Sequence, residues 1–523
     1  MRWRRQLAAA GTLLLLATGW ASTPTAQADT AVTPKSSTIT VTGAGWGHGK
    51  GLSQYGAYGA ALSGLSYTKI LAFYYPKTTS STLSSGDSIR VWISADNDNR
   101  LTVKPATGLK LKDSAGKTYQ LPTGSGYTQW RVSRSGSARV LHYRNAKGAW
   151  VAKSPGLNKS LSWSFSNTDK ATVSLILPGG TTRTYRGTLT LRFYGSGART
   201  VNSLSMENYL RSVVPAEMPG GWATEALKAQ AVAARSYAAR YRANLGGKQV
   251  YDICDTTACQ AYHGTGTEFS ATNAAVAATA NRVLTYNGSY ALTMFSSSNG
   301  GHSADGGVAY LVAKKDPYDG KVKSQTWTKA LSTSTIQKAF PSVGTLKSVQ
   351  VTQRDGDGSW GGRVDQVKIV GSKGSVSVAG GTFRSTFGLK ERLFTLSGGV
   401  PTTTLSAVTP TANAAGPTSA NETRWKAMGG ADSPLGQAKG DEVPVAGGWH
   451  ASYAGGDLWW SEATGSHWLA GELLKAYLAA GGPASDLGFP TSDQTAVADG
   501  SFADFQFGRI SCPSSGACAV TFG

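Results

Sequence analysis

The central part of the fold is decided by the stretch Met206-Glu-Asn-Tyr-Leu-Arg-Ser-Val-Val-Pro-Ala-Glu-Met-Pro-Gly-Gly-Trp-Ala-Thr-Glu-Ala-Leu-Lys-Ala-Gln-Ala-Val-Ala-Ala-Arg235. A short apolar helix meets a proline, and a longer Ala-rich helix follows. One carboxylate, Glu217, falls at the corner between them. A corner can hold a side chain rigidly while leaving it reachable from a groove. We therefore take Glu217 as the first candidate functional residue.

Residues 1–28 have the pattern of a secretory signal peptide. Three arginines precede an apolar run over residues 7–16, and Ala26-Gln-Ala28 is a small-residue cleavage site. No later run is long or apolar enough to span a bilayer. We expect a secreted, extracellular protein whose mature chain begins near Asp29.

The charge of the chain is strongly positive. The 523 residues include 51 Lys and Arg against 30 Asp and Glu, a formal charge of +21, and removal of the three signal arginines leaves about +18. Outside the cell, such an excess favours anionic wall polymers or lipid headgroups over nucleic acid. The alternative is that the charge serves solubility alone. We expect no nucleic-acid partner and a monomer.

The four cysteines fall in two close pairs, Cys254 with Cys259 and Cys512 with Cys518. In an oxidising compartment, pairs at this spacing form small disulfide-closed loops.

Alternating apolar residues predict a β-rich α+β fold. The expected strands are residues 38–42, 89–94, 127–133, 161–165, 171–177 and 187–194, and a β-rich insert covers about 100–195. Helical patterns occur at 57–75 and 270–281 as well as around Glu217.

Residues 398–421 contain Pro, Thr, Ala, Ser and Gly with almost no charge, which is typical of a linker. The tail that follows, 422–523, contains a repeat. The segment Trp425-Lys-Ala-Met-Gly-Gly-Ala-Asp-Ser-Pro-Leu-Gly436 returns 52 positions later, beginning at Tyr477 and ending in Leu-Gly-Phe-Pro490. This pattern resembles the LGFP repeat, which implies a small wall-binding repeat domain.

Several motifs are shared with one known family. They are Met206-Glu-Asn-Tyr-Leu210, Val213-Val-Pro-Ala-Glu-Met-Pro219, the run from Glu225 to Tyr237, Cys254-Asp-Thr-Thr-Ala-Cys-Gln-Ala-Tyr262, Phe295-Ser-Ser-Ser-Asn-Gly-Gly-His302 and Phe383-Arg-Ser-Thr-Phe-Gly-Leu389 with Leu393-Phe-Thr-Leu396. On these motifs the central region resembles the SpoIID/LytB family. We expect residues 29–397 to form one domain of this kind.

A glycine-rich box departs from the family order. The box is Gly43-Ala-Gly-Trp-Gly-His-Gly-Lys-Gly-Leu-Ser-Gln-Tyr-Gly56. In the family it follows the last strands of the domain, whereas here it precedes everything. We interpret the order as a circular permutation, which a fold with neighbouring termini tolerates. This predicts that the box lies beside residues 393–396 and faces Glu217.

The resemblance implies cleavage of peptidoglycan glycan strands by one glutamate, a role that maps onto Glu217. Two other acids are nearby, but Glu207 and Glu225 lie in first turns of helices, and Glu225 is three residues before Lys228. Acids at such positions complement the helix dipole and pair along the helix surface. A structural, capping role is the alternative for Glu217. One acid suffices if the C6 hydroxyl of the sugar attacks, giving a 1,6-anhydro end without water. Such an acid needs a raised pKa.

The substrate groove is predicted to be lined by the glycine box and by the polar run after residue 295. The candidates are His48, Gln54, Tyr55, Ser296, Ser297, Ser298, Gly300, Gly301 and His302, with Asn299 in the same run. The alternative for the run is a turn capped by its own side chains, and for His48 it is structural hydrogen bonding.

Two further alternatives remain. Some relatives hold zinc near the cysteine segment, and Cys254, Cys259 and His263, with His302 as a fourth ligand, would supply such a site. We favour the disulfide, and thus no metal and no cofactor. The rival function is a non-catalytic scaffold or a stimulator of a separate amidase or hydrolase.

Overall fold

The structure is a computed structural model that describes residues 28–34, 37–83, 87–245, 247, 249–398, 420–440, 442–445, 448–461, 464–485, 487–506 and 508–522. The predicted signal peptide (1–28) and linker (398–421) lie outside these residues except at their ends. In the described part of the chain, no helix has the length and apolar composition needed to cross a membrane.

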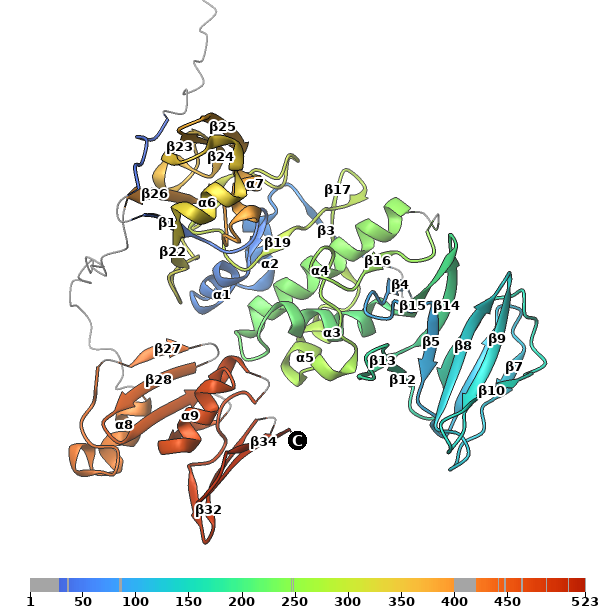
Figure 1. Cartoon of the computed structure of the whole chain (residues 1–523). Helices are drawn as coiled ribbons and strands as arrows, with labels where there is room; N and C mark the ends of the chain where they lie inside the picture. Colours follow the sequence, from blue (N-terminus) through green and yellow to red (C-terminus); the bar gives the residue numbers. More distant parts are fainter. Residues whose placement is uncertain are drawn as a thin grey trace, which may run out of the picture. The chain divides into compact units, whose positions relative to one another are not determined.

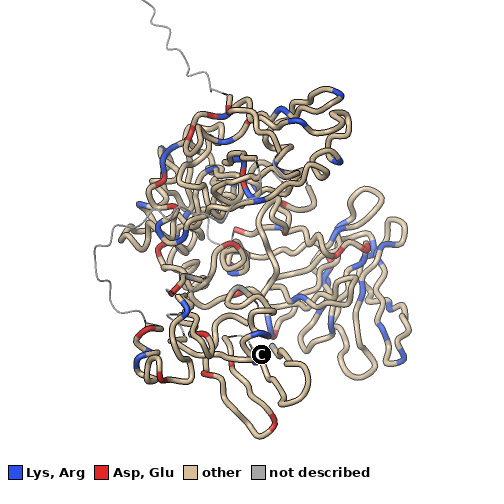
Figure 2. The backbone as a smooth tube through the Cα atoms, turned by 60° about the vertical axis from the view of Figure 1, so that its left-hand side comes forward, with Lys and Arg blue, Asp and Glu red and all other residues tan. Residues whose placement is uncertain are grey.

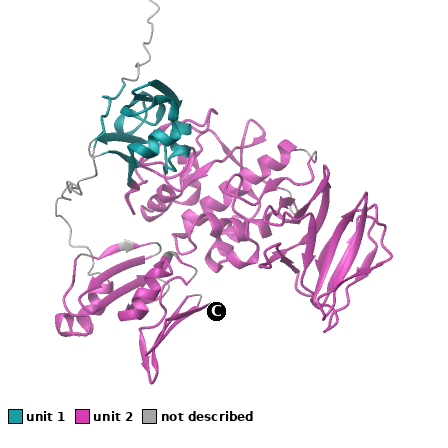
Figure 3. Ribbon diagram, in the orientation of Figure 1, with its two compact units in different colours: residues 1–43, 327–401 teal, residues 44–326, 402–523 magenta. Residues whose placement is uncertain are grey.

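The chain divides into two compact units, and each is built from two separate segments (Figure 3). One unit comprises Met1–Gly43 and Trp327–Pro401, and the other comprises Ala44–Thr326 and Thr402–Gly523. The single domain expected over residues 29–397 stays a prediction.

The first unit contains two small sheets. The first has the order β22-β1-β26, with β22 at Thr326–Ser332, β1 at Thr38–Ala44 and β26 at Phe394–Gly398. The second has the order β23-β24-β25, at Leu346–Arg354, Val364–Gly371 and Gly374–Ala379, accompanied by α6 (Thr333–Ala339) and α7 (Gly380–Thr386). Alternate residues of β1 are apolar, so Ile39 and Val41 enter the core with Phe383 and Phe394.

The second unit contains a pair of sheets that combine the strands of the β-rich insert with three strands from outside residues 100–195 (Figure 1). The seven-stranded sheet has the order β16 (Ile253–Cys254), β4 (Ser88–Trp92), β15 (Gly197–Ser205), β14 (Thr188–Tyr194), β11 (Trp163–Asn167), β6 (Leu109–Asp113) and β7 (Thr118–Gln120). The six-stranded sheet has the order β10 (Trp150–Lys153), β9 (Ala138–Arg144), β8 (Gln129–Ser135), β5 (Arg100–Val103), β12 (Thr172–Ile176) and β13 (Thr182–Arg186).

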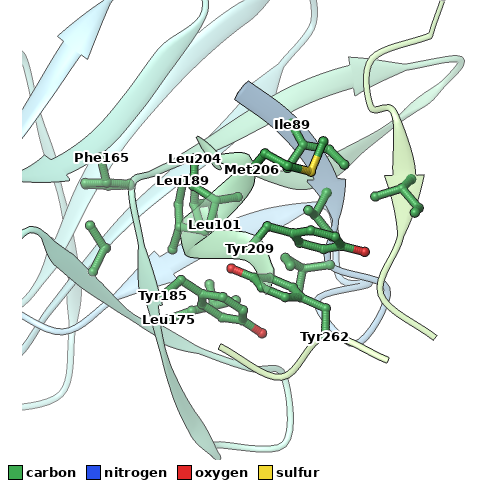
Figure 4. Packing of buried hydrophobic residues seen from close by; sticks show 14 of the residues in the cluster. Ile89, Leu101, Phe165, Leu175, Tyr185, Leu189, Leu204, Met206, Tyr209 and Tyr262 are labelled. Carbon is green, nitrogen blue, oxygen red and sulfur yellow. The ribbon is translucent and has the colours of Figure 1, made fainter. Parts of the chain in front are cut away.

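The two sheets share one hydrophobic core. Leu101 and Leu175 of one sheet pack in the same cluster as Phe165 and Leu189 of the other (Figure 4). The cluster continues onto the helical region through Tyr209 and Tyr262 (Figure 4). The insert is therefore joined to the helices around Glu217 by a continuous apolar interior.

The helical region of this unit consists of α1 (Gln54–Leu62), α2 (Tyr67–Tyr74), α3 (Met206–Glu217), α4 (Thr224–Leu245) and α5 (Ser270–Ala278). Ser53 and Ser205 cap α1 and α3 by accepting from the N–H groups of Gly56 and Asn208. Short strands complete the region: β2 (Leu52–Ser53) with β19 (Phe295–Ser296), β3 (Thr79–Thr82) with β17 (Arg282–Tyr286) and β18 (Ser289–Tyr290), and β20 (His302–Ser303) with β21 (Lys314–Lys315).

The tail contains two four-stranded sheets. The first follows α8 (Ala420–Ala427) and consists of β27 (Val443–Val445), β28 (Gly448–Tyr453), β29 (Gly456–Ser461) and β30 (Gly465–Leu469). The second follows α9 (Gly471–Ala479) and consists of β31 (Thr495–Val497), β32 (Gly500–Phe505), β33 (Gly508–Pro513) and β34 (Ala519–Phe522).

The predicted repeat in the tail is confirmed, and each copy contains the same hydrogen bond. The indole N–H of Trp425 donates to the carbonyl of Gly436, and the hydroxyl of Tyr477 donates to the carbonyl of Gly488. Each aromatic residue thus fastens the glycine eleven positions ahead in its own copy. The β-rich α+β class is also confirmed.

Candidate active site around Glu217

Glu217 is the last residue of α3. The apolar face of this helix is buried through Tyr209, Val213 and Val214. Met218 then turns to an extended conformation, and its N–H donates to the carbonyl of Val214 at 2.9 Å. The helix therefore ends at Glu217, which lies at the corner predicted between α3 and α4.

The carboxylate of Glu217 is half-buried. Its Oε1 accepts a hydrogen bond from the backbone N–H of Ala261 at 2.9 Å. Burial raises the pKa of Glu217, and the bond from Ala261 opposes that rise. Within the described residues, no lysine, arginine or histidine forms an ion pair with it. Its protonated form is therefore favoured at a higher pH than that of an exposed glutamate.

The two neighbouring acids have cationic partners. Glu207 binds the buried guanidinium of Arg235 through both oxygens, at 2.9 and 2.7 Å. Glu225 pairs with Lys228 at 2.7 Å and accepts from the N–H of Tyr67. The helix-surface pairing expected of Glu225 is confirmed, whereas Glu207 pairs with a buried arginine on α4 rather than along the surface.

The glycine box and the polar run come together in space. Strands β2 and β19 pair in parallel, with Ser53 opposite Ser296. Trp46 and Ser298 exchange two backbone hydrogen bonds, and the N–H of Tyr55 donates to the carbonyl of Ser297. The predicted union of these two segments is thus present.

Aromatic contacts connect this pair of segments to the corner. The ring of Tyr55 lies 4.8 Å from that of Trp222, and Tyr58 stacks on the same indole at 4.6 Å. Phe295 lies 6.4 Å from Tyr237, between ring centroids. Burial raises the pKa of Tyr237, and its hydrogen bond with Tyr241 and the charges of Tyr241 and Glu217 raise it further.

Several predicted groove residues are engaged within the protein. His48 is half-buried, and its Nδ1 accepts from the N–H of Lys50. His302 is half-buried in β20, with its Nδ1 3.1 Å from the carbonyl of Ser303. Gln54 and Ser296 are buried, and their Nε2 and Oγ atoms make no hydrogen bond to any described residue.

An aspartate that sequence reasoning missed fills the polar turn. Asp319 accepts from the Ser298 hydroxyl at 2.7 Å and from the N–H groups of Asn299 and Gly300 at 2.8 and 2.9 Å. The N–H of Gly301 lies 3.4 Å from the same oxygen. Both glycines have positive φ, at 71° and 89°, which turns the N–H groups inward.

A second aspartate completes this network. Asp316 accepts from the amide of Asn299 and from the hydroxyl of Tyr74, each at 2.7 Å. Burial raises the pKa of Asp319, and the bond from Ser298 opposes the rise. The sequence signal for both acids is the run Asp316-Pro-Tyr-Asp319, but its partners lie 17 to 21 residues away and on α2.

Both predicted disulfides are present, Cys254 with Cys259 and Cys512 with Cys518. The first closes the loop that leads to Ala261, the hydrogen-bond donor to Glu217. The adjacent Gln260 is also fixed, because it accepts from the Tyr209 hydroxyl and donates to the carbonyl of Ala234.

The same loop was the candidate zinc site. Its two thiols are joined to each other, and zinc binds cysteine as free thiolate. His263 donates its backbone N–H to Ser212, and burial lowers the pKa of its imidazole. In the described segments, no group of three or more His, Cys, Asp or Glu residues is arranged to hold a metal ion.

The glycine box is predicted to lie beside residues 393–396, and its first residue, Gly43, does so. Strand β1 runs antiparallel to β26, with Gly43 opposite Phe394 and Val41 opposite Leu396. This is the adjacency that a permuted chain requires. The permutation itself stays a prediction.

Comparison with known proteins agrees with these features. Residues 194–286 match the SpoIID family, Stage II sporulation protein, and residues 435–485 and 487–523 match the LGFP repeat. The chain is similar to the amidase enhancer of Bacillus subtilis (strain 168), with 37% identity over 170 residues, or 31% of this chain and 21% of that protein.

Two further relatives match a similar part of the chain. An uncharacterized protein of Brachyspira hyodysenteriae is 36% identical over 155 residues, or 28% of this chain and 42% of the relative. Stage II sporulation protein D of Bacillus subtilis (strain 168) is 28% identical over 165 residues, or 28% of this chain and 48% of the relative. The chain thus spans less than half the length of each of these three relatives. Residues 194–286, which include Glu217, thus match a SpoIID domain, and the tail carries LGFP repeats.

Proposed function

We propose that this protein cleaves the glycan strands of peptidoglycan, with Glu217 as its general acid and base. The observation that carries the proposal is the state of Glu217. It is a half-buried carboxyl at a helix end, its pKa is raised by burial, and no cation in the described residues neutralises it. A carboxyl in this state keeps its proton to a higher pH than an exposed glutamate does, as suits a general acid.

The proposed reaction needs one acid. The Glu217 carboxyl donates its proton to the glycosidic oxygen, and the bond from the anomeric carbon to that oxygen breaks. The resulting carboxylate then takes the proton of the C6 hydroxyl of the same sugar, whose oxygen bonds to the anomeric carbon. The products are a 1,6-anhydro end and a free hydroxyl end, Glu217 regains its proton, and no water is consumed.

In this proposal, residues of the glycine box contact the glycan strand. His48 and Tyr55 are half-buried, and Trp46 is 52% exposed. Ser298, Gly300 and Gly301 use their polar groups on Asp319, so their part in sugar binding is to shape the turn.

The wall location rests on the tail and on the relatives. LGFP repeats suggest association with the cell wall, and a relative named amidase enhancer suggests a wall-related role. We further propose that the signal peptide at 1–28 directs export, that 398–421 is a linker, and that 422–523 binds the wall. The proposed partners are peptidoglycan glycan strands and anionic wall polymers.

A direct test digests purified glycan strands with the wild type and with Glu217→Gln, and reads the products by mass spectrometry. The proposal expects anhydro ends from the wild type and a loss of about 100-fold or more in the variant. Glu225→Gln is the matched control, because Glu225 lies in the same region but pairs with Lys228.

A second candidate function is favoured by one specific observation, the 37% identity to the amidase enhancer. In this alternative the protein binds the wall and stimulates a separate amidase without cleaving glycan. The alternative predicts no product from the protein alone and increased product when an amidase is added. Glu217→Gln would leave that stimulation intact.

A further inference from the structure

The positive charge of the chain is concentrated in the β-rich insert. Residues 100–195 contain eight lysines and eight arginines but two acids, Asp113 and Asp169, a net charge of +14 out of the +21 of the whole chain. Lys and Arg positions recur along these strands with few acidic ones between them (Figure 2). The positive charge is therefore distributed unevenly along the chain, and the net charge of this part exceeds what solubility requires.

The register of the six-stranded sheet places part of this charge on one face. Leu101, Trp130 and Leu141 point into the shared core. The residues that alternate with them point outward, and pairing sets them side by side: Arg100 opposite Ser133, Arg131 opposite both Thr102 and His142, and Arg144 opposite Trp150. We call Arg100, Arg131, Arg144 and Trp150 the arginine face.

The three arginines of this face repel one another. Burial lowers the pKa of Arg131, and the charges of Arg100 and Arg144 lower it further, whereas the charges of Asp98 and Asp96 oppose this. In the described part of the chain, none of the three forms a salt bridge. Asp98 and Asp96 offset part of this repulsion without forming an ion pair with the three arginines, and a bound anion would relieve the rest.

Arg131 is held in a fixed orientation. Its guanidinium lies 3.7 Å above the ring of Trp150, and its Nε donates to Thr102 Oγ1 at 3.0 Å. Because Arg131 covers Trp150, the face offers guanidinium groups rather than an open aromatic platform for stacking a sugar. It is suited to recognise the charged groups of a polymer instead of its sugar rings.

We propose that the arginine face binds an anionic cell-wall polymer whose repeating units are joined by phosphodiesters. A phosphodiester offers two oxygens to the guanidinium fork, and a chain of them supplies charges at regular intervals to arginines on neighbouring strands. We assign the polymer to the cell wall because the LGFP repeats support the proposed wall location of the protein. This assignment does not depend on catalysis by Glu217.

The test measures binding of the full chain to purified poly(glycerol phosphate), which contains no glycan strand. Arg100→Gln/Arg144→Gln removes two exposed charges of the face. Lys110→Gln/Lys112→Gln is the matched control, because it removes the same charge from β6 in the other sheet. The proposal expects affinity to fall about tenfold or more in the arginine variant, or about 1.4 kcal/mol, and less than about twofold in the control.

Four results would overturn the proposal. They are equal losses in the two variants, unchanged binding in the arginine variant, equal binding of a polyuronate that has only carboxylates, and binding to vesicles of anionic lipid without binding to the polymer. Circular dichroism and thermal unfolding confirm that the variants are folded. Glu217→Gln should bind the polymer as the wild type does, so loss of glycan cleavage leaves this inference standing.

Discussion

At the scale of single residues, Glu217 differs from its neighbours in what surrounds it. Glu207 and Glu225 each contact a cation, whereas the oxygen of Glu217 accepts from the backbone N–H of Ala261. The pairing of Glu225 with Lys228 follows from the sequence, because residues three apart meet on a helix. The pairing of Glu207 with Arg235 joins residues 28 apart, and only the packed fold reveals it.

The pH dependence of glycan cleavage tests the state of Glu217. Because burial raises its pKa, the protonated acid persists to higher pH than in an exposed glutamate. Activity should therefore be lost as the pH rises through this raised pKa. A pH profile of the cleavage rate measures this limb, and a limb near pH 4.3, the value for an exposed glutamate, would contradict the burial argument.

Asp96 provides a stability test outside the candidate site. Burial raises its pKa from 3.8 to about 7, although Thr200 donates a hydrogen bond to it at 2.5 Å. The folded protein therefore holds a proton that the unfolded chain releases at lower pH. Stability is greatest below pH 3.8 with respect to this group and falls as the pH rises to about 7.

The fall attributable to Asp96 is at most about 4 kcal/mol, from roughly three pKa units at about 1.4 kcal/mol each. Asp96→Asn should consequently be more stable than the wild type at pH 8 and lose most of that advantage at pH 4. Urea unfolding of both proteins at the two values measures the difference. An advantage that is equal at both would show that Asp96 is not the titrating group.

At the scale of elements, the loop closed by Cys254 and Cys259 positions the donor to Glu217. A loop of this length gives a disulfide stabilisation of about 2 kcal/mol. Cys254→Ser/Cys259→Ser should lower glycan cleavage, because Ala261 would no longer be held against the carboxylate.

The tail disulfide supplies the matched control. Cys512→Ser/Cys518→Ser removes a bond of similar loop length from the second LGFP repeat and should leave cleavage of soluble strands unchanged. The test compares the rates at which the two double variants cleave soluble glycan strands. Equal losses in both would mean that the disulfide near Ala261 has no special part in the site.

The elements also show where sequence reasoning ends. Alternation predicted β4, β8, β12 and β14, because each buries one face over several residues. It did not predict that the acids at 316 and 319 fill the polar turn, since that contact depends on two short segments meeting across the fold. Two-residue strands such as β19 carry no periodicity to detect.

At the scale of the whole molecule, the chain forms two compact units, each built from two separate segments. Local motifs do not encode which strands close a unit. The pairing of β1 with β26 joins residues more than 350 positions apart, and the unusual position of the glycine box is what pointed to it.

Deletion of the tail should show that wall binding and catalysis belong to different parts of the chain. Removal of residues 422–523 is expected to reduce retention on purified cell walls while leaving cleavage of soluble glycan strands unchanged, because the candidate site lies within residues 44–326. Co-sedimentation with walls and strand digestion measure the two properties. Unchanged co-sedimentation would place wall binding elsewhere, with the basic insert as the first place to test.

The central claim is that Glu217 cuts glycan strands by itself, and one measurement tests it most directly. Purified wild type, Glu217→Gln and Glu225→Gln are each incubated with purified glycan strands, and the soluble products are analysed by mass spectrometry. Our account predicts 1,6-anhydro ends from the wild type and Glu225→Gln, and a loss of about 100-fold or more in Glu217→Gln. Cleavage retained by Glu217→Gln, or products that lack anhydro ends, would contradict it.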